Sequence, residues 1–154
     1  PEANCTWGND EMIFFGSVDV SVAIAVEGGL FTPVIKNANY LNLRNISVQM
    51  KDYVIKANAG KLLPEDYEGG NFSISNLGMY GIDSFSAIIN PPQSGILAVG
   101  SISKKPIVID NEVKICNIMT CQLSGDHRAI DGAVGARLLK EFKGLIENPV
   151  KMIV

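Results

Sequence analysis

The chain has 154 residues, of which 47% are hydrophobic and 19% are charged. This is enough apolar material for one globular core and too little charge for a disordered chain. The formal net charge is −3 and the sequence has no long basic run, so it lacks the electrostatic footprint of a nucleic-acid-binding protein. Small molecules and other protein surfaces are the expected partners.

The cysteines and the apolar stretches bear on the cellular environment. Cys5, Cys116 and Cys121 cannot pair completely, and their spacing fits neither a disulfide framework nor a metal site. They indicate a reducing compartment and are expected to be small apolar fillers. No apolar stretch reaches the roughly 18 to 20 residues that span a bilayer, and residues 1–4 do not resemble a signal peptide. We therefore expect a soluble intracellular protein with no metal site.

The first third of the chain shows strand patterns. Residues 1–10 are polar and turn-like. Residues 18–26 alternate between large apolar side chains and small or polar ones, which is typical of a strand with one apolar face. Gly28 and Gly29 permit a tight turn, so residues 30–35 are expected to pair with that strand as a hairpin.

The pattern changes to a helical one at Asn42. Apolar residues then recur every three or four positions, which predicts an amphipathic helix that ends at Gly60. Residues 64–67 resemble a short helical turn that begins with proline. Residues 71–75 and 86–90 are each expected to form a short strand.

The last third of the chain predicts a hairpin and a helix. Residues 95–101 are almost all apolar, as in a buried strand. Residues 107–110 and 113–123 flank Asn111 as the arms of a hairpin. Asp131 can cap a helix that ends before Asn148-Pro149 and has one apolar face. The apolar tail, Met152-Ile153-Val154, is too short to bury itself and is expected to be covered by another subunit.

The only histidine of the chain, His127, lies between this hairpin and this helix. A lone histidine is often a core residue, but the five polar or glycine residues at 124–128 are unsuited to an apolar interior. A histidine on an accessible turn can take and return a proton near neutral pH. The pattern therefore predicts an acid–base residue four positions before Asp131.

Residues 126–132, Asp-His-Arg-Ala-Ile-Asp-Gly, resemble the signature of the dihydrolipoamide acyltransferase components of 2-oxo acid dehydrogenase complexes. Residues 64–82 and 88–94 look like two further stretches of that family, and residues 18–39 and 149–154 are similar as well. The His-x-x-x-Asp-Gly string alone is also found in chloramphenicol acetyltransferases and peptide-synthetase condensation domains. Three ordered motifs make the resemblance specific.

The resemblance implies an α/β fold, more closely an α+β two-layer sandwich of the chloramphenicol acetyltransferase type. A mixed sheet flanked by helices would form a trimer with active sites between subunits. The family's catalytic domain begins further upstream, so residues 1–154 are expected to be the C-terminal two thirds of the catalytic (inner core) domain. The lipoyl and subunit-binding domains are then absent, and with them the opening of the catalytic domain.

The resemblance also implies the reaction and the roles of three residues. The form of residues 76–81 looks most like the acetyl-transferring members of pyruvate dehydrogenase complexes. An acetyl group would move between dihydrolipoamide and coenzyme A, with acetyl-CoA as the coenzyme A thioester. His127 would be the general base and Ser75 the donor to the tetrahedral oxyanion. Asp131 would shape the turn that aims the imidazole.

Other positions near the motifs allow more than one role. Asn90, Gln93 and Ser94 are candidates to line the substrate channel, although a purely structural role suits the rigid Pro91-Pro92 corner better. Arg128 is expected either to pair with an acid inside the fold or to face solvent. Gly125 stands where the family more often has Cys, Ala or Tyr.

The partners implied by the resemblance are other subunits and separate domains. Trimers would assemble into a core of 24 or 60 subunits. Lipoamide would arrive on a separate lipoyl domain, and the missing domains would contact the pyruvate dehydrogenase and dihydrolipoamide dehydrogenase components. No nucleic acid and no membrane is expected. Bacterial cytoplasm and mitochondrial matrix both fit this assignment.

Three other functions compete with acetyl transfer. A succinyl or branched-chain acyltransferase would use the same chemistry on another acyl group. A non-catalytic scaffold subunit would not need His127, Ser75 and Asp131, which are all present. A drug-modifying O-acetyltransferase is disfavoured by the Asp126-His127-Arg128 form of the motif.

Overall fold

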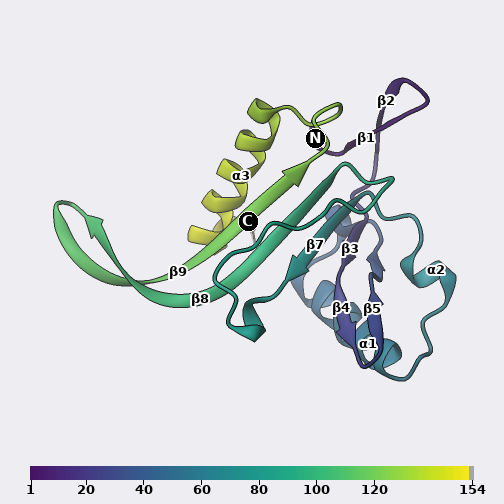
Figure 1. The fold of residues 1–154 in the computed structure, drawn as a ribbon, viewed down its shortest axis with the longest axis horizontal. Helices are drawn as coiled ribbons and strands as arrows, with labels where there is room; N and C mark the ends of the chain where they lie inside the picture. The colour runs from purple at the N-terminus through teal and green to yellow at the C-terminus, as the bar shows by residue number, and fades with distance from the viewer. Residues whose placement is uncertain (153–154) are drawn as a thin grey trace.

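The computed structural model describes residues 1–152, and its centre is a five-stranded mixed sheet. The strand order is β6 (Val34–Ile35), β3 (Val20–Val22), β7 (Phe72–Asn76), β8 (Gly95–Ile109) and β9 (Glu112–Gly125). Strands β3, β7 and β8 run parallel, whereas β6 and β9 are antiparallel at the two edges (Figure 1).

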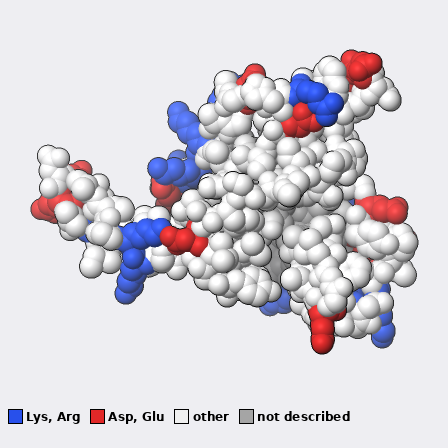
Figure 2. Space-filling model, viewed as in Figure 1, with Lys and Arg blue, Asp and Glu red and all other residues white. Residues whose placement is uncertain are grey.

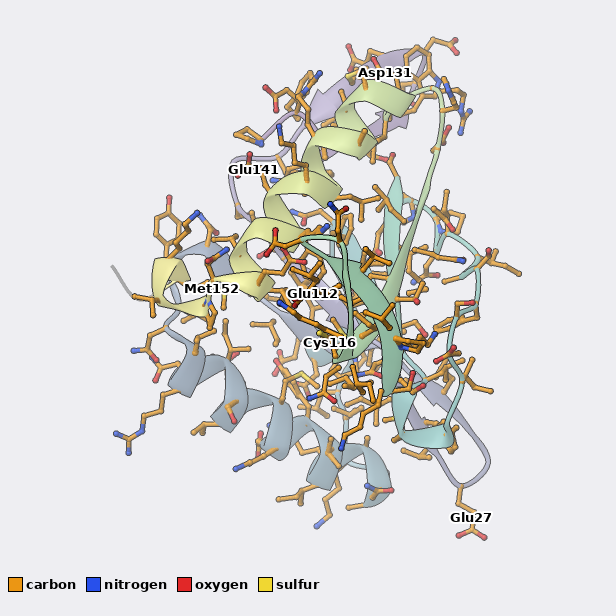
Figure 3. All side chains as sticks on the ribbon, turned by 90° about the vertical axis from the view of Figure 1, so that its left-hand side faces the viewer. Glu27, Glu112, Cys116, Asp131, Glu141 and Met152 are labelled. Carbon is orange, nitrogen blue, oxygen red and sulfur yellow. The ribbon has the colours of Figure 1, made fainter. Side chains whose placement is uncertain are left out.

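Two long helices flank this sheet, α1 (Leu43–Asn58) and α3 (Gly132–Glu147). They lie on the same side of the strands in the side view, so the helices form one layer and the sheet the other (Figure 3). The predicted α/β class, with a mixed sheet flanked by helices, is therefore confirmed. The buried apolar residues include Val34, Ile96, Leu97 and Ile130.

The N-terminal residues form a hairpin, so the turn-like prediction for residues 1–10 was wrong. Strand β1 (Cys5–Gly8) pairs with β2 (Glu11–Phe14) around a turn at Asn9 and Asp10, whose φ values are 53° and 60°. Cys5 is buried against Ala129 and Ile130. This contact joins residues far apart in the chain, which local sequence patterns do not report.

The strand predicted at residues 18–26 is divided into two. Strand β3 pairs with β6, whereas β4 (Ile24–Val26) pairs with β5 (Gly29–Phe31) in a separate two-stranded sheet. The hairpin turn at Gly28 is confirmed, with a φ of 92°. The alternation predicted that Val20 and Val22 face the core from β3. This was wrong, because Ser21 is buried while Val20 and Val22 are only partly buried.

The predicted helices are present. The side chain of Asn42 accepts a hydrogen bond from the Asn45 amide (2.9 Å) and caps α1, and Gly60 follows the helix with a φ of 63°. The short helix α2 spans Pro64–Tyr67. Asp131 caps α3, and a 3₁₀ turn at Pro149–Met152 follows that helix. Ile153 and Val154, the end of the predicted subunit contact, lie outside the described residues.

The strand predicted at residues 86–90 was wrong. Side chains rather than a strand ladder hold this segment: Ser86 Oγ lies 2.9 Å from Gln122 Oε1, and Ser124 Oγ donates to the Ala87 carbonyl (2.7 Å). Short apolar runs beside prolines satisfy the strand pattern without a backbone partner.

The β8–β9 hairpin is much longer than predicted and projects from the body of the molecule (Figure 1). Asp110 and Asn111 form its turn with φ values of 53° and 62°. Positive φ at both central residues is the geometry of the type I′ turns that match strand twist, so the prediction of a hairpin around Asn111 is confirmed.

Candidate active site

His127 lies on a turn just after β9, and its side chain is exposed. The turn is anchored on both sides of the histidine. The Asp126 amide donates to the Ser94 carbonyl (2.8 Å), and the Asp126 carbonyl accepts from the Ala129 and Ile130 amides (2.9 and 2.8 Å). Ala129 and Ile130 are buried in the core. The fold thus presents His127 to the outside from a firmly held backbone.

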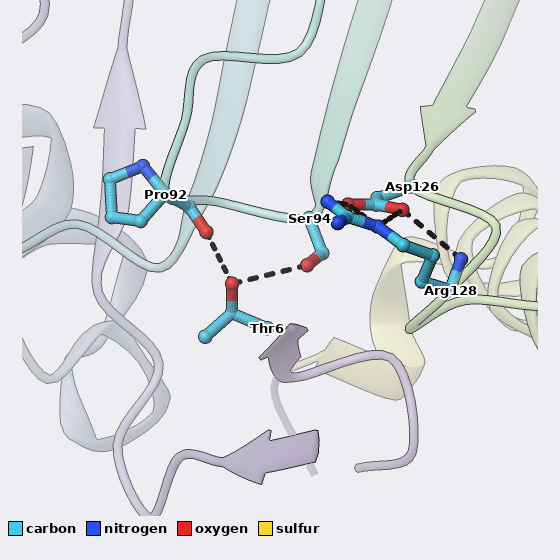
Figure 4. Close-up of polar contacts among 5 residues, drawn as sticks. All are labelled: Thr6, Pro92, Ser94, Asp126 and Arg128. Atoms are coloured by element: carbon cyan, nitrogen blue, oxygen red, sulfur yellow. Dashed lines mark hydrogen bonds and ion pairs between the residues drawn. The ribbon is translucent and has the colours of Figure 1, made fainter. Parts of the chain in front are cut away.

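The two neighbours of His127 bind each other (Figure 4). Arg128 Nη2 lies 2.6 Å from Asp126 Oδ2, and Arg128 Nε lies 3.0 Å from Oδ1. Hydrogen bonds from the Arg128 guanidinium, and then from its backbone amide, lower the pKa of Asp126 to about 2. Arg128 therefore faces solvent, with its side chain 65% exposed, and pairs with the neighbouring Asp126 rather than with an acid inside the fold.

Asp131 begins α3, at the end of the helix opposite to Met152 (Figure 3). Its carboxylate accepts from the Val134 amide (2.8 Å), as an N-cap does. This hydrogen bond is the main cause that lowers the pKa of Asp131, with smaller contributions from Arg137 and His127. The cap fixes the helix that follows the His127 turn, which agrees with a role in shaping that turn.

Ser75 lies near the end of β7 and is partly buried. It sits opposite Ala98 of β8, which sits opposite Gln122 of β9. Two strand spacings across and three residues along the sheet therefore separate Ser75 from Gly125, a Cα distance of roughly 14 Å. Within one chain the structure does not bring the Ser75 hydroxyl to the His127 imidazole.

The loop after Ser75 crosses β8 at unusually short range. The Gly78 amide donates to Asn76 Oδ1 (2.9 Å). A Cβ atom on Gly78 would come within 2.8 Å of the Gly100 carbonyl oxygen, and one on Gly100 would come within 2.1 Å of the Asp83 carbonyl oxygen. Both positions therefore require glycine, which explains the presence of Gly78 in the stretch of family resemblance at residues 64–82.

Two of the three channel candidates serve the fold. Gln93 is buried, donates from Nε2 to Ser21 Oγ (2.8 Å) and accepts from the Ser73 hydroxyl. Ser94 is buried and donates to Thr6 Oγ1 (3.3 Å), and Thr6 in turn donates to the Pro92 carbonyl (Figure 4).

Asn90, the third candidate, is exposed. At Gly125, an added Cβ would meet Ile130 at 3.4 Å, an ordinary contact, so the backbone does not demand glycine there.

A groove that no sequence pattern predicted lies between the β8–β9 pair and α3. It measures about 610 Å³ and is lined by Ile118, Leu139, Phe142 and Ile146, among others. None of the predicted site residues lines it. Sequence periodicity showed the apolar face of α3 but not that the sheet covers it incompletely.

The charged groups are dispersed. In Figure 2 the acidic and basic side chains lie around the edges of the visible face and on the projecting hairpin, and most of the centre of that face is uncharged. Among residues 1–152, no three His, Cys, Asp or Glu side chains are placed to hold a metal ion together. Within the same range, every helix is too short or too polar to cross a membrane.

The site's layout can be set against known proteins. The family model for the 2-oxoacid dehydrogenases acyltransferase (catalytic domain) matches residues 1–154. The chain belongs to this acyltransferase family. It is 52% identical over 154 residues to the dihydrolipoyllysine-residue acetyltransferase component of the pyruvate dehydrogenase complex of Rickettsia conorii. That alignment covers all of this chain and 37% of the relative, so the chain spans little more than a third of that relative's length.

Solved structures of this acyltransferase family share the fold. One is Azotobacter vinelandii dihydrolipoamide acetyltransferase, in which the catalytic roles of a serine, a histidine and an asparagine were investigated. It aligns with a TM-score of 0.95 and 29% identity, over 100% of this chain and 64% of that one. The cubic core of a pyruvate dehydrogenase multienzyme complex aligns with a TM-score of 0.95 and 28% identity, over 100% and 64% of the two chains.

Proposed function

We propose that residues 1–154 form the C-terminal two thirds of an acyltransferase catalytic domain that moves an acetyl group between dihydrolipoamide and coenzyme A. Residue spacing carries this proposal. In the Azotobacter vinelandii enzyme the serine precedes the histidine by 52 positions and the asparagine follows it by four. Ser75, His127 and Asp131 have the same spacing in this chain.

The proposed chemistry follows from the two substrates. A thiol with a pKa near ~8.5 is mostly protonated at neutral pH, so its sulfur needs a base before it can attack. His127 takes the proton of the coenzyme A thiol, and the thiolate attacks the carbonyl of S-acetyldihydrolipoamide. The tetrahedral oxyanion accepts a hydrogen bond from the Ser75 hydroxyl. Collapse expels the dihydrolipoyl thiolate, which recovers the proton from His127, and acetyl-CoA leaves.

The separation of Ser75 and His127 within one chain supports an active site between subunits. His127 of one subunit would face Ser75 of its neighbour in a homotrimer, and trimers would build a 24- or 60-subunit core. The similarity to a cubic core supports this assembly. Lipoyl domains would deliver the acetyl group, and the other domains of the protein would contact the pyruvate dehydrogenase and dihydrolipoamide dehydrogenase components.

Mixed trimers of the full-length protein test the proposal. Each of the variants His127→Ala and Ser75→Ala is expected to be nearly inactive with dihydrolipoamide and acetyl-CoA. Refolded together, they form some interfaces that contain both intact side chains, so part of the activity should return. If mixed trimers confirmed by mass are no more active than either variant alone, the site lies within one subunit and the proposed arrangement is wrong.

The acyl group is part of the same proposal. The form of residues 76–81 and the identity to a pyruvate dehydrogenase component support acetyl over succinyl or branched-chain groups. A comparison of acetyl-CoA, succinyl-CoA and isobutyryl-CoA as donors separates these alternatives, and inactivity with all three would favour a scaffold subunit. We place the protein in bacterial cytoplasm or the mitochondrial matrix, as the resemblance implies.

A further inference from the structure

The residues on either side of His127 are held by an unusually complete set of contacts. The Asp126 carboxylate accepts from Arg128 Nη2 (2.6 Å), from Nε with both oxygens (3.0 and 3.2 Å) and from the Arg128 backbone amide (3.1 Å). The side chains of Asp126 and Arg128, the two sequence neighbours of His127, are thus bonded to each other. A bidentate guanidinium–carboxylate pair fixes direction as well as distance.

The backbone beside this ion pair is hydrogen-bonded to other segments of the fold. The Asp126 amide is bound to the Ser94 carbonyl at the start of β8, and the Ser94 hydroxyl is bound to Thr6 of β1 (Figure 4). The Asp126 side chain is 22% exposed, whereas that of Arg128 is 65% exposed. The carboxylate is therefore the fixed member of the pair, and the guanidinium is drawn to it from solvent.

We propose that the Asp126–Arg128 ion pair is a positioning device that holds the His127 imidazole in its productive direction. The inference rests on the proposed function of His127. Because the paired side chains of Asp126 and Arg128 occupy one side of the turn, they restrict the directions in which the His127 side chain can point. Neither Asp126 nor Arg128 needs to touch substrate, so both are positioning residues.

The pair also balances the charge beside the imidazole. An unpaired carboxylate there would favour the imidazolium form, and an unpaired guanidinium would disfavour it. The other charged groups near the turn are Asp131, which caps α3, and Arg137 further along α3, which also interacts with Glu2. Ser94, just before β8, and Thr6 of β1 are uncharged. Cys5 of β1 lies 3.5 Å from the Ala129 carbonyl, and burial raises the pKa of its thiol, which favours the neutral form.

Three variants of the full-length protein separate position from charge. Arg128→Lys keeps the charge and loses the bidentate fork. Its kcat should fall by roughly 10- to 100-fold, as expected for a small misplacement of a reacting group, with KM for coenzyme A and the pH profile little changed. Arg128→Gln should lower kcat similarly and move the acid limb of the pH–rate profile to higher pH. Asp126→Asn should move that limb to lower pH.

The controls make each outcome decisive. Lys56→Gln breaks another exposed ion pair, with Asp52 on α1, and should leave kcat and the pH profile unchanged. Melting temperatures of all variants should match the parent, because exposed pairs contribute little to stability.

If Arg128→Gln and Asp126→Asn keep the parental kcat and pH profile while His127→Ala is inactive, the positioning role is wrong and the proposed function stands. If kcat falls only together with melting temperature and the limb does not move, the pair is merely structural. If His127→Ala keeps parental activity, the proposed function itself fails.

Discussion

The inner and outer halves of the β8–β9 pair both contain large apolar side chains but lie in opposite environments. In the inner half Ile96, Leu97 and Ala98 are only 2–7% exposed. In the outer half four large apolar side chains are 70–75% exposed, namely Ile102, Val108, Val113 and Ile115. The same kinds of apolar side chain are therefore buried in one half and exposed in the other.

The difference follows from what lies beside each half. Strand β7 pairs with β8 as far as Val99. The pairing of β8 with β9 shifts register between Val99 and Ile102, where the exposed outer half begins. Among the described residues, β9 is the only strand that pairs with β8 beyond that point. The inner half is therefore packed within its own subunit and supports the His127 turn. The outer half presents apolar surface of the kind that subunit contacts cover.

Replacing His127 tests most directly whether the chemistry belongs to the inner half. His127→Ala in the full-length protein should lower kcat by roughly 10²- to 10⁴-fold, the usual contribution of a general base. Its melting temperature should not change, because the side chain is exposed and contributes little to the core. Parental turnover in the purified variant would mean that His127, at the end of the inner half, is not the general base.

A pair of serines on one face of β7 sharpens the same comparison. Ser75→Ala should lower kcat by about 10²- to 10³-fold, the effect of losing one oxyanion donor, with little change in stability. Ser73 is buried and donates to Gln93. Ser73→Ala should instead cost about 1–3 kcal/mol of unfolding free energy, because the Gln93 oxygen loses its partner. An effect of Ser75→Ala on KM alone would mean that Ser75 only binds substrate.

Two truncations to alanine compare the halves as packing surfaces. Leu97→Ala should reduce the free energy of unfolding by about 2–5 kcal/mol, as buried leucines do. Ile115→Ala should change it by no more than about 0.5 kcal/mol in dissociated subunits, because its side chain is exposed there. Urea unfolding measures both, and native mass measurement shows whether Ile115→Ala weakens assembly. Equal destabilisation of dissociated subunits would contradict the comparison.

The sequence predicted those elements whose determinants are local. The Asn42 and Asp131 caps, the spacing of apolar residues in α1 and α3 and the Asp110-Asn111 turn all act within a few residues, and all are present. The motifs likewise placed His127 on an accessible turn.

The missed features depend on residues distant in sequence. Strand β1 is fixed by packing of Cys5 on Ala129 and Ile130. Ser21 is buried because Gln93, from another part of the chain, binds it. The separation of Ser75 from His127 is a matter of strand order and register, which no local pattern encodes.

Asp131 gives the smallest predicted effect and links the cap to pH. The Val134 amide lowers the pKa of Asp131 in the folded state. A lowered folded-state pKa contributes stability above the unfolded-state value, near ~4 for aspartate, and this contribution is lost as pH falls through the folded-state pKa. Asparagine caps helices about as well but carries no charge. The melting temperature of Asp131→Asn should therefore lie slightly below that of the parent at pH 7, and the difference should shrink below pH 4.

Two further observations make this test specific. Asp131→Ala loses the cap as well as the charge, so it should melt below Asp131→Asn at every pH. Other carboxylates with lowered pKa values, such as Asp126 and Asp83, titrate in parent and variant alike and cancel in the difference. Because the Azotobacter vinelandii enzyme has an asparagine at the corresponding spacing, Asp131→Asn should also retain most of the activity. A difference in melting temperature that does not vary with pH would show that the carboxylate acts only through its shape.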